Sequence, residues 1–122
     1  MNPILDDNNT SVSFFKKEVQ KFVKDRNWAK YHTPKNLIQA LSIEVSELSE
    51  IFLFKEISLD TIKKNKTLLE NISDEIADVF IYLISLSNSI NLDLTNAFTN
   101  KMVKNKMKYP LEEFRDGYYR KQ

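Results

Sequence analysis

Cysteine, glycine and histidine are scarce in this chain of 122 residues, and each scarcity excludes a class of site. The absence of cysteine excludes disulfide bonds, thiolate zinc sites and a cysteine nucleophile, and it is consistent with a reducing cytoplasm. The sole glycine is Gly117, so the glycine-rich loops with which Rossmann and P-loop proteins cradle phosphate are absent. A phosphate group would have to be held by side chains and a metal ion.

The balance of charges argues against nucleic acid as a partner, and the apolar stretches argue against a membrane. Lysine and arginine number 18 against 17 aspartates and glutamates, so no overall basic field favours nucleic acid. The first ten residues, "MNPILDDNNT", lack the basic region and apolar core of a signal peptide. The longest stretch with a single charge, residues 76–92, is slightly short for a membrane span and carries Asp78. We therefore expect a cytoplasmic protein that binds neither nucleic acid nor membrane.

The hydrophobic periodicity predicts an all-α fold. Residues 12–27 carry one apolar stripe with helical spacing, made of Phe15, Val19, Phe22 and Val23. Thr33 suits the N-cap of a second helix, with Pro34 at its first position, and this helix is expected to run to about Phe54. Residues 55–66 read as a polar connection with at most one short helical turn.

The second half of the chain predicts two further helices. Thr67 and Glu70 have the spacing of a capping box, which would open a third helix reaching about Ile90. Asp93 or Thr95 can cap a fourth, which ends at Pro110. The length suits one domain, residues 1–122, with polar tails at about 1–11 and 111–122. So short a chain has a thin core, which oligomerisation would reinforce.

The segment "EVSELSE" places acidic residues within the apolar second helix. On a helical wheel of about 100° per residue, Glu44 falls on the buried side, Glu47 at the edge of the apolar stripe, and Glu50 on the opposite face. On the third helix, Glu75 and Asp78 share a flank with Tyr82. Positions three apart are neighbours on a helix, so two packed helices can bring four carboxylates to one point, namely Glu44, Glu47, Glu75 and Asp78.

Four carboxylates in a half-buried place need protons or cations to neutralise them. Hard oxygen ligands suit Mg²⁺, with Mn²⁺ as a second candidate. A di-iron bundle would need Glu-x-x-His pairs, and the single histidine, His32, lies outside both acidic motifs. The competing interpretation is an ordinary solvated face, because exposed glutamate is common on helices.

Three segments carry a resemblance to a known family, namely "RNWAKYHTPKNLIQALSIEVSELSEIF", "DEIADVFIYLISL" and "KMVKNKMKYP". Together they resemble the MazG-like all-α nucleoside triphosphate pyrophosphohydrolases, and within these the dCTP pyrophosphatase branch, over about residues 14–110. The resemblance implies a four-helix Mg²⁺-binding bundle that forms a homodimer or homotetramer. It also implies hydrolysis of a (deoxy)nucleoside triphosphate, with dCTP one candidate, to the monophosphate and pyrophosphate.

The resemblance also assigns roles to single residues. Glu44, Glu47, Glu75 and Asp78 match the metal ligands, and Tyr82 matches a substrate-contacting tyrosine. The phosphate and sugar segment corresponds to Lys101, Asn105, Lys108 and Tyr109, while Trp28 and His32 match residues near the base. Ordinary structural roles stay open for Trp28 in the core, His32 beside a turn, Tyr82 at the rim of the core, and Lys101 and Lys108 on a solvated face. Two departures, Phe54 in place of a second tryptophan and Lys35 in place of arginine, leave the base preference open.

In the mechanistic hypothesis, the four acids hold Mg²⁺, and the metal stabilises the negative charge of the substrate phosphates. Glu47 also accepts a proton from the attacking water, and Lys101 and Lys108 neutralise the pyrophosphate that leaves. Two alternatives stand beside it. The first is a non-catalytic helical module that forms oligomers, and the second is a related hydrolase acting on dUTP or modified nucleotides.

Overall fold

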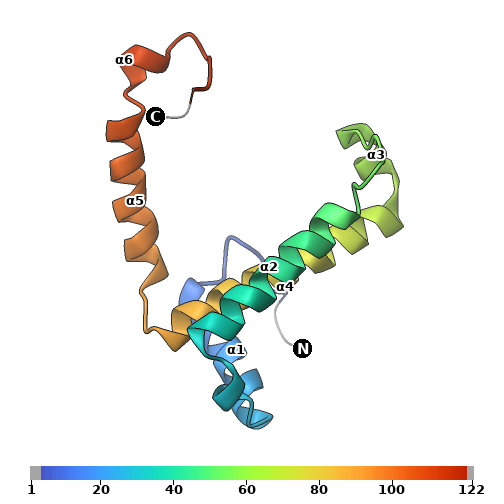
Figure 1. Ribbon diagram of the computed structural model, residues 1–122, viewed down its shortest axis with the longest axis vertical. Helices are drawn as coiled ribbons and strands as arrows, with labels where there is room; N and C mark the ends of the chain where they lie inside the picture. Colours follow the sequence, from blue (N-terminus) through green and yellow to red (C-terminus); the bar gives the residue numbers. More distant parts are fainter. Residues whose placement is uncertain (1–3, 121–122) are drawn as a thin grey trace. The chain divides into compact units, whose positions relative to one another are not determined.

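Over residues 4–120, the computed structural model contains helices, turns and loops but no strand, which confirms the predicted all-α fold (Figure 1). The predicted tail positions 1–3 and 121–122 lie outside the described residues. In chain order the helices are α1 (Val12–Asp25), η1 (Ala29–Tyr31, a 3₁₀ turn), α2 (Pro34–Glu50), α3 (Leu59–Lys64), α4 (Lys66–Ser89), α5 (Leu94–Lys108) and α6 (Leu111–Phe114). The chain divides into two compact units, Met1–Asn91 and Leu92–Gln122.

Two helices begin at the side-chain caps that the sequence indicates. Thr33 accepts a hydrogen bond from the Asn36 amide at 3.3 Å, with Pro34 at the first position of α2. Asp93 caps α5 by accepting from the Asn96 amide at 2.9 Å. These oxygens satisfy amides that have no partner within the helix, so both starts are set locally.

Two predicted boundaries are wrong. Helix α4 begins at Lys66, because Asn65 Oδ1 accepts from the Leu68 amide at 3.0 Å and makes Asn65 the cap. Thr67 therefore lies inside the first turn, and asparagine is at least as good a cap as threonine. Helix α2 ends at Glu50, not near Phe54. Residues 51–54 form turns, and Phe54 has φ of 58°, a left-handed conformation that stops a helix.

Helix α4 is the centre of the first unit. Helix α2 runs antiparallel along it (Figure 1), and α1 and α3 also pack against it. Phe15 of α1 meets Phe80 of α4 edge-on with ring centroids 5.2 Å apart, and Asn88 Nδ2 donates to the Lys16 carbonyl at 3.0 Å. The buried side chains of the described residues are few, namely Leu37, Ile72, Ile84, Ser85 and Ser87. The core of the first unit is thin, as the short chain predicted.

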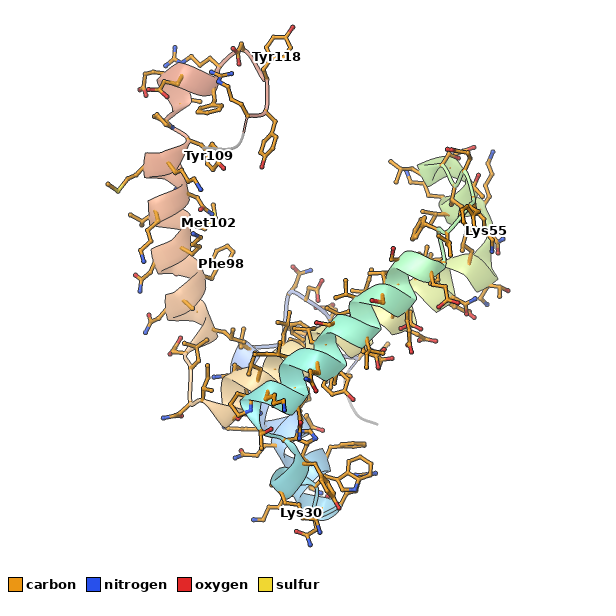
Figure 2. All side chains as sticks on the ribbon, viewed as in Figure 1. Lys30, Lys55, Phe98, Met102, Tyr109 and Tyr118 are labelled. Atoms are coloured by element: carbon orange, nitrogen blue, oxygen red, sulfur yellow. The ribbon has the colours of Figure 1, made fainter. Side chains whose placement is uncertain are left out.

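The second unit consists of α5 and α6. Phe98 and Met102 lie on the same side of α5 and are exposed (Figure 2). The turn after α5 brings aromatic rings together, because the ring of Tyr109 meets that of Phe114 edge-on at 5.4 Å and stacks with that of Tyr119 at 6.4 Å. This small cluster fixes the chain where Pro110 separates α5 from α6.

The apolar stretch 76–92 falls mostly within α4. Of the helices that the structure describes, α4 included, none is long and apolar enough to cross a membrane.

Candidate metal centre and adjoining cavity

The two central helices bring three acidic side chains together. Glu44 comes from α2, and Glu75 and Asp78 come from α4. Each offers one carboxylate oxygen, and these oxygens all lie within 4.8 Å of one another. Because Glu75 and Asp78 are three residues apart, they project from neighbouring positions on α4, and the packing of α2 supplies the third acid. We call these three residues the acidic cluster.

Two oxygens of the acidic cluster are buried without a partner. Glu44 Oε2 and Glu75 Oε2 accept no hydrogen bond from any described residue, whereas the Asp78 side chain is exposed. A buried polar atom without a partner is costly and requires an explanation. A cation bound between the oxygens would satisfy both, so the donor set fits a divalent metal ion that prefers oxygen ligands.

The electrostatics of the acidic cluster support the same interpretation. The pKa of Glu44 is raised to about 7, first by burial, then by the proximity and charge of Glu47, with smaller effects from Asp78 and Glu75. Burial likewise raises the pKa of Glu75, followed by the charges of Glu47 and Asp78. These carboxyls therefore resist ionisation together unless a cation compensates them.

Glu47 lies beside the acidic cluster, not within it. Its side chain is exposed, yet its carboxyl lies close enough to those of Glu44 and Glu75 to raise the pKa of both. It therefore occupies a place from which it can reach both the cluster and solvent. Glu50, which the helical wheel turns away from the buried side, is exposed.

A cavity of about 700 Å³ opens next to the acidic cluster, within the first unit. Its lining includes five of the predicted site residues, namely Trp28, His32, Glu44, Asp78 and Tyr82. Aromatic walls come from α1 and α4, through Phe15, Phe22 and Phe80. Trp28 is 44% exposed and meets the Phe22 ring edge-on at 5.9 Å, so its indole is only partly covered. A lining that combines carboxylates of the acidic cluster with several aromatic rings suits a ligand with a phosphate and a flat ring.

A second cavity, of about 450 Å³, adjoins the first. The two share four lining residues, namely Val19, Val23, His32 and Ser85. Beyond them the second cavity is more polar, with Gln20, Lys24, Asn27, Asn88 and Ser89 in its lining. Half-buried His32 therefore lies where the two cavities meet.

The other five predicted substrate-binding residues line neither cavity. Phe54 is 98% exposed at the end of the turns after α2. Lys101, Asn105, Lys108 and Tyr109 belong to the second unit. There the Tyr109 amide donates to the Asn105 carbonyl at 2.8 Å, and the Lys108 ammonium lies 5.6 Å from the Tyr109 ring centroid. Their predicted roles toward a substrate stay predictions.

Sequence reasoning missed nine residues of the cavity lining as ligand contacts, namely Phe15, Glu18, Val19, Phe22, Val23, Ala77, Phe80, Ile81 and Ser85. For Ser85 a signal was present, because it continues the row from Asp78 through Tyr82 at helical spacing. Phe15 and Phe80 were assigned to apolar stripes, and periodicity does not distinguish a core position from a cavity wall.

The chain is similar to known proteins over most of its length. A family model described as the MazG-like family matches residues 39–118. Mouse dCTP pyrophosphatase 1 is 36% identical over 98 residues and the human protein of that name 34% over 94, covering 75% and 74% of this chain and 54% of each relative. The chain thus spans about half the length of these curated relatives. A pyrophosphatase structure from Archaeoglobus fulgidus is similar with a TM-score of 0.74 and 35% identity, covering 88% of this chain and 99% of that one.

Proposed function

The chain belongs to the MazG-like family, and from this premise we propose that it hydrolyses nucleoside triphosphates to the monophosphate and pyrophosphate. The relatives named dCTP pyrophosphatase 1 and the similar pyrophosphatase structure support this class of reaction. They make dCTP the first substrate to test. The departures at Phe54 and Lys35 keep dUTP and modified nucleotides in the panel.

One observation carries the proposal: the acidic cluster has two buried carboxylate oxygens without partners, and its members Glu44 and Asp78 line the large cavity. Glu44, Glu75 and Asp78 would hold Mg²⁺, or Mn²⁺ in its place. The ion would supply positive charge against the substrate phosphates. A nucleotide whose phosphates face the acidic cluster would then place its sugar and base in the cavity beside Trp28 and Tyr82.

The chain's own residues would perform the remaining steps. Glu47 contacts the cluster and reaches solvent, so its carboxylate can orient a water molecule and accept its proton as the water attacks the α-phosphorus. The aromatic walls exclude bulk water and hold the base. For Lys101 and Lys108 we keep the role that the resemblance assigns them, neutralising the pyrophosphate.

The same proposal includes assembly as a homodimer or homotetramer. Large apolar side chains are exposed on every long helix, among them Ile43, Leu69, Ile76 and Phe98. Exposed apolar side chains of this size are what an association surface would cover. Size-exclusion chromatography with light scattering tests it, and a strictly monomeric protein at micromolar concentration would contradict it.

Pyrophosphate release from a panel of nucleoside and deoxynucleoside triphosphates tests the reaction directly. We expect turnover with Mg²⁺, none in EDTA, and severe loss in Glu75→Gln but not in the matched surface variant Glu50→Gln. The alternative of a non-catalytic interaction module predicts no pyrophosphate with any nucleotide. It also predicts no gain in melting temperature with Mg²⁺ plus a nucleotide analogue, since a ligand stabilises only a protein that binds it.

A further inference from the structure

Ser85 is a largely buried residue of α4 that lines a cavity and whose hydroxyl makes no hydrogen bond within the described part of the chain. Its side chain is 5% exposed, and it lines both the large cavity and the polar one beside it. Within the described part of the chain, no side-chain hydrogen bond involves its Oγ. Because Ser85 lines both cavities and its hydroxyl bonds no described residue, the hydroxyl is available to bond a ligand there.

Several helical hydroxyls bond back to their own helix. Ser42, Ser46 and Thr99 each donate to the carbonyl four residues earlier, at 2.8–3.0 Å. Ser87, the other buried serine, donates to the Ile84 carbonyl at 2.8 Å and lines neither cavity. Ser85 therefore differs from its neighbour Ser87 in both orientation and bonding. Bonding back to the helix is the usual solution for such a group.

The position of Ser85 along α4 fits the far end of a nucleotide. Asp78 of the acidic cluster, Tyr82 and Ser85 follow one another on one face of α4, and all three line the large cavity. Seven residues of helix separate Asp78 from Ser85, a rise of about 10 Å. A nucleotide with its α-phosphate at the cluster would span this distance with its sugar and base. A phosphate held at the cluster would lie about two helical turns from Ser85, whereas the sugar and base would reach it.

We propose that the Ser85 hydroxyl hydrogen-bonds the edge of the substrate's nucleobase, which makes Ser85 a specificity-determining residue. The inference rests on the proposed function and adds the residue that contacts the base. His32 also lines both cavities, and its imidazole can hydrogen-bond the same edge of the nucleobase. A hydroxyl both donates and accepts, so Ser85 suits an edge that carries an amino group, a carbonyl or a ring nitrogen.

Binding to the intact protein, measured by calorimetry without turnover, tests the inference. The probes are dCMP, dUMP and dTMP, with 2-deoxyribose 5-phosphate as the probe that has no base. Ser85→Ala should weaken binding of the preferred monophosphate about fivefold, the loss of one neutral hydrogen bond, and leave binding of the sugar phosphate unchanged. Ser85→Thr keeps the hydroxyl and should retain most of the affinity. Ser87→Ala removes a buried hydroxyl that faces no cavity and is the matched control.

The outcomes separate the inference from the proposed function. Absence of pyrophosphate release by the wild-type protein would refute the function, whatever Ser85 does. An active wild type with unchanged base affinity in Ser85→Ala would overturn the inference alone. So would an equal loss for the sugar phosphate, or an equal loss in Ser87→Ala, because both indicate a general change in the fold. Failure of the wild type to bind any of the three monophosphates would also overturn it.

Discussion

Replacing Glu44 by glutamine should stabilise the metal-free protein at alkaline pH, although it removes a proposed metal ligand. The carboxyl of Glu44 is half-buried beside Glu47, Glu75 and Asp78, and its Oε2 has no partner. Because its pKa is raised from 4.5 to about 7 in the folded state, the folded protein binds this proton more tightly than the unfolded chain does. Its stabilising contribution is therefore complete below about pH 4.5 and is lost as the pH rises to about 7 and above.

The size of the effect follows from the same shift. One pKa unit corresponds to about 1.4 kcal/mol, so ionising Glu44 in the folded protein would cost up to about 3 kcal/mol. Solvent near the exposed Asp78 and Glu47 screens part of the repulsion, which leaves about 1–2 kcal/mol. Glutamine has nearly the same shape and no charge. For a chain of this length the gain in melting temperature at about pH 8 is roughly 3–8 °C.

Thermal melts in EDTA at about pH 5 and about pH 8 measure this difference. The gain of Glu44→Gln over the wild type should appear at the higher pH and shrink at the lower, while Glu50→Gln, on the same helix but exposed, should show neither. Adding millimolar Mg²⁺ should reverse the order, because only the wild type retains the ligand. If Glu44→Gln were equally destabilised at both pH values, or if Glu50→Gln behaved in the same way, the proposed electrostatics of the acidic cluster would be wrong.

Three further predictions concern catalysis, the core and a helix start. Glu47→Gln should lower kcat about 100-fold or more while nucleotide binding persists, as for loss of a general base; full activity would refute that role. Ile84→Ala should lower the free energy of unfolding by about 2–5 kcal/mol in urea titrations. A loss under about 1 kcal/mol would contradict this, because it would mean that neighbouring side chains fill the space left in the core. Thr33→Ala should cost about 1 kcal/mol, whereas Thr67→Ala should be nearly neutral because Asn65 is the cap; equal costs would contradict this assignment.

Local sequence signals predicted most of the fold. The helical type follows from apolar spacing, and the starts of α2 and α5 follow from Thr33 and Asp93, whose side chains bond amides only three residues away. The errors occurred where two local signals competed. Asn65, two residues before the threonine that the capping-box pattern favoured, is the cap of α4. Residues 51–54 are apolar and extend the helical pattern, but Phe54 adopts a left-handed backbone conformation that the pattern does not indicate.

The candidate site was predictable to the extent that helical spacing controls it. Spacing placed Glu75 and Asp78 side by side on one helix and turned Glu44 inward and Glu50 outward. Spacing alone did not predict that Glu47 would lie beside a three-acid cluster, because this depends on how α2 is rotated against α4. Spacing put Ser85 in a row with Asp78 and Tyr82, but only the packing of the helices made this row the wall of a cavity.

The sequence by itself determined the helices, their caps and the acidic residues available for a metal site, because these depend on contacts within a few residues. Only the tertiary structure decided which carboxylate oxygens meet without partners, and that Trp28, His32 and Tyr82 line one cavity beside them. Such decisions depend on the packing of α1 and α2 against α4. Residues far apart in the chain meet there, and burial in that place determines which charges remain uncompensated.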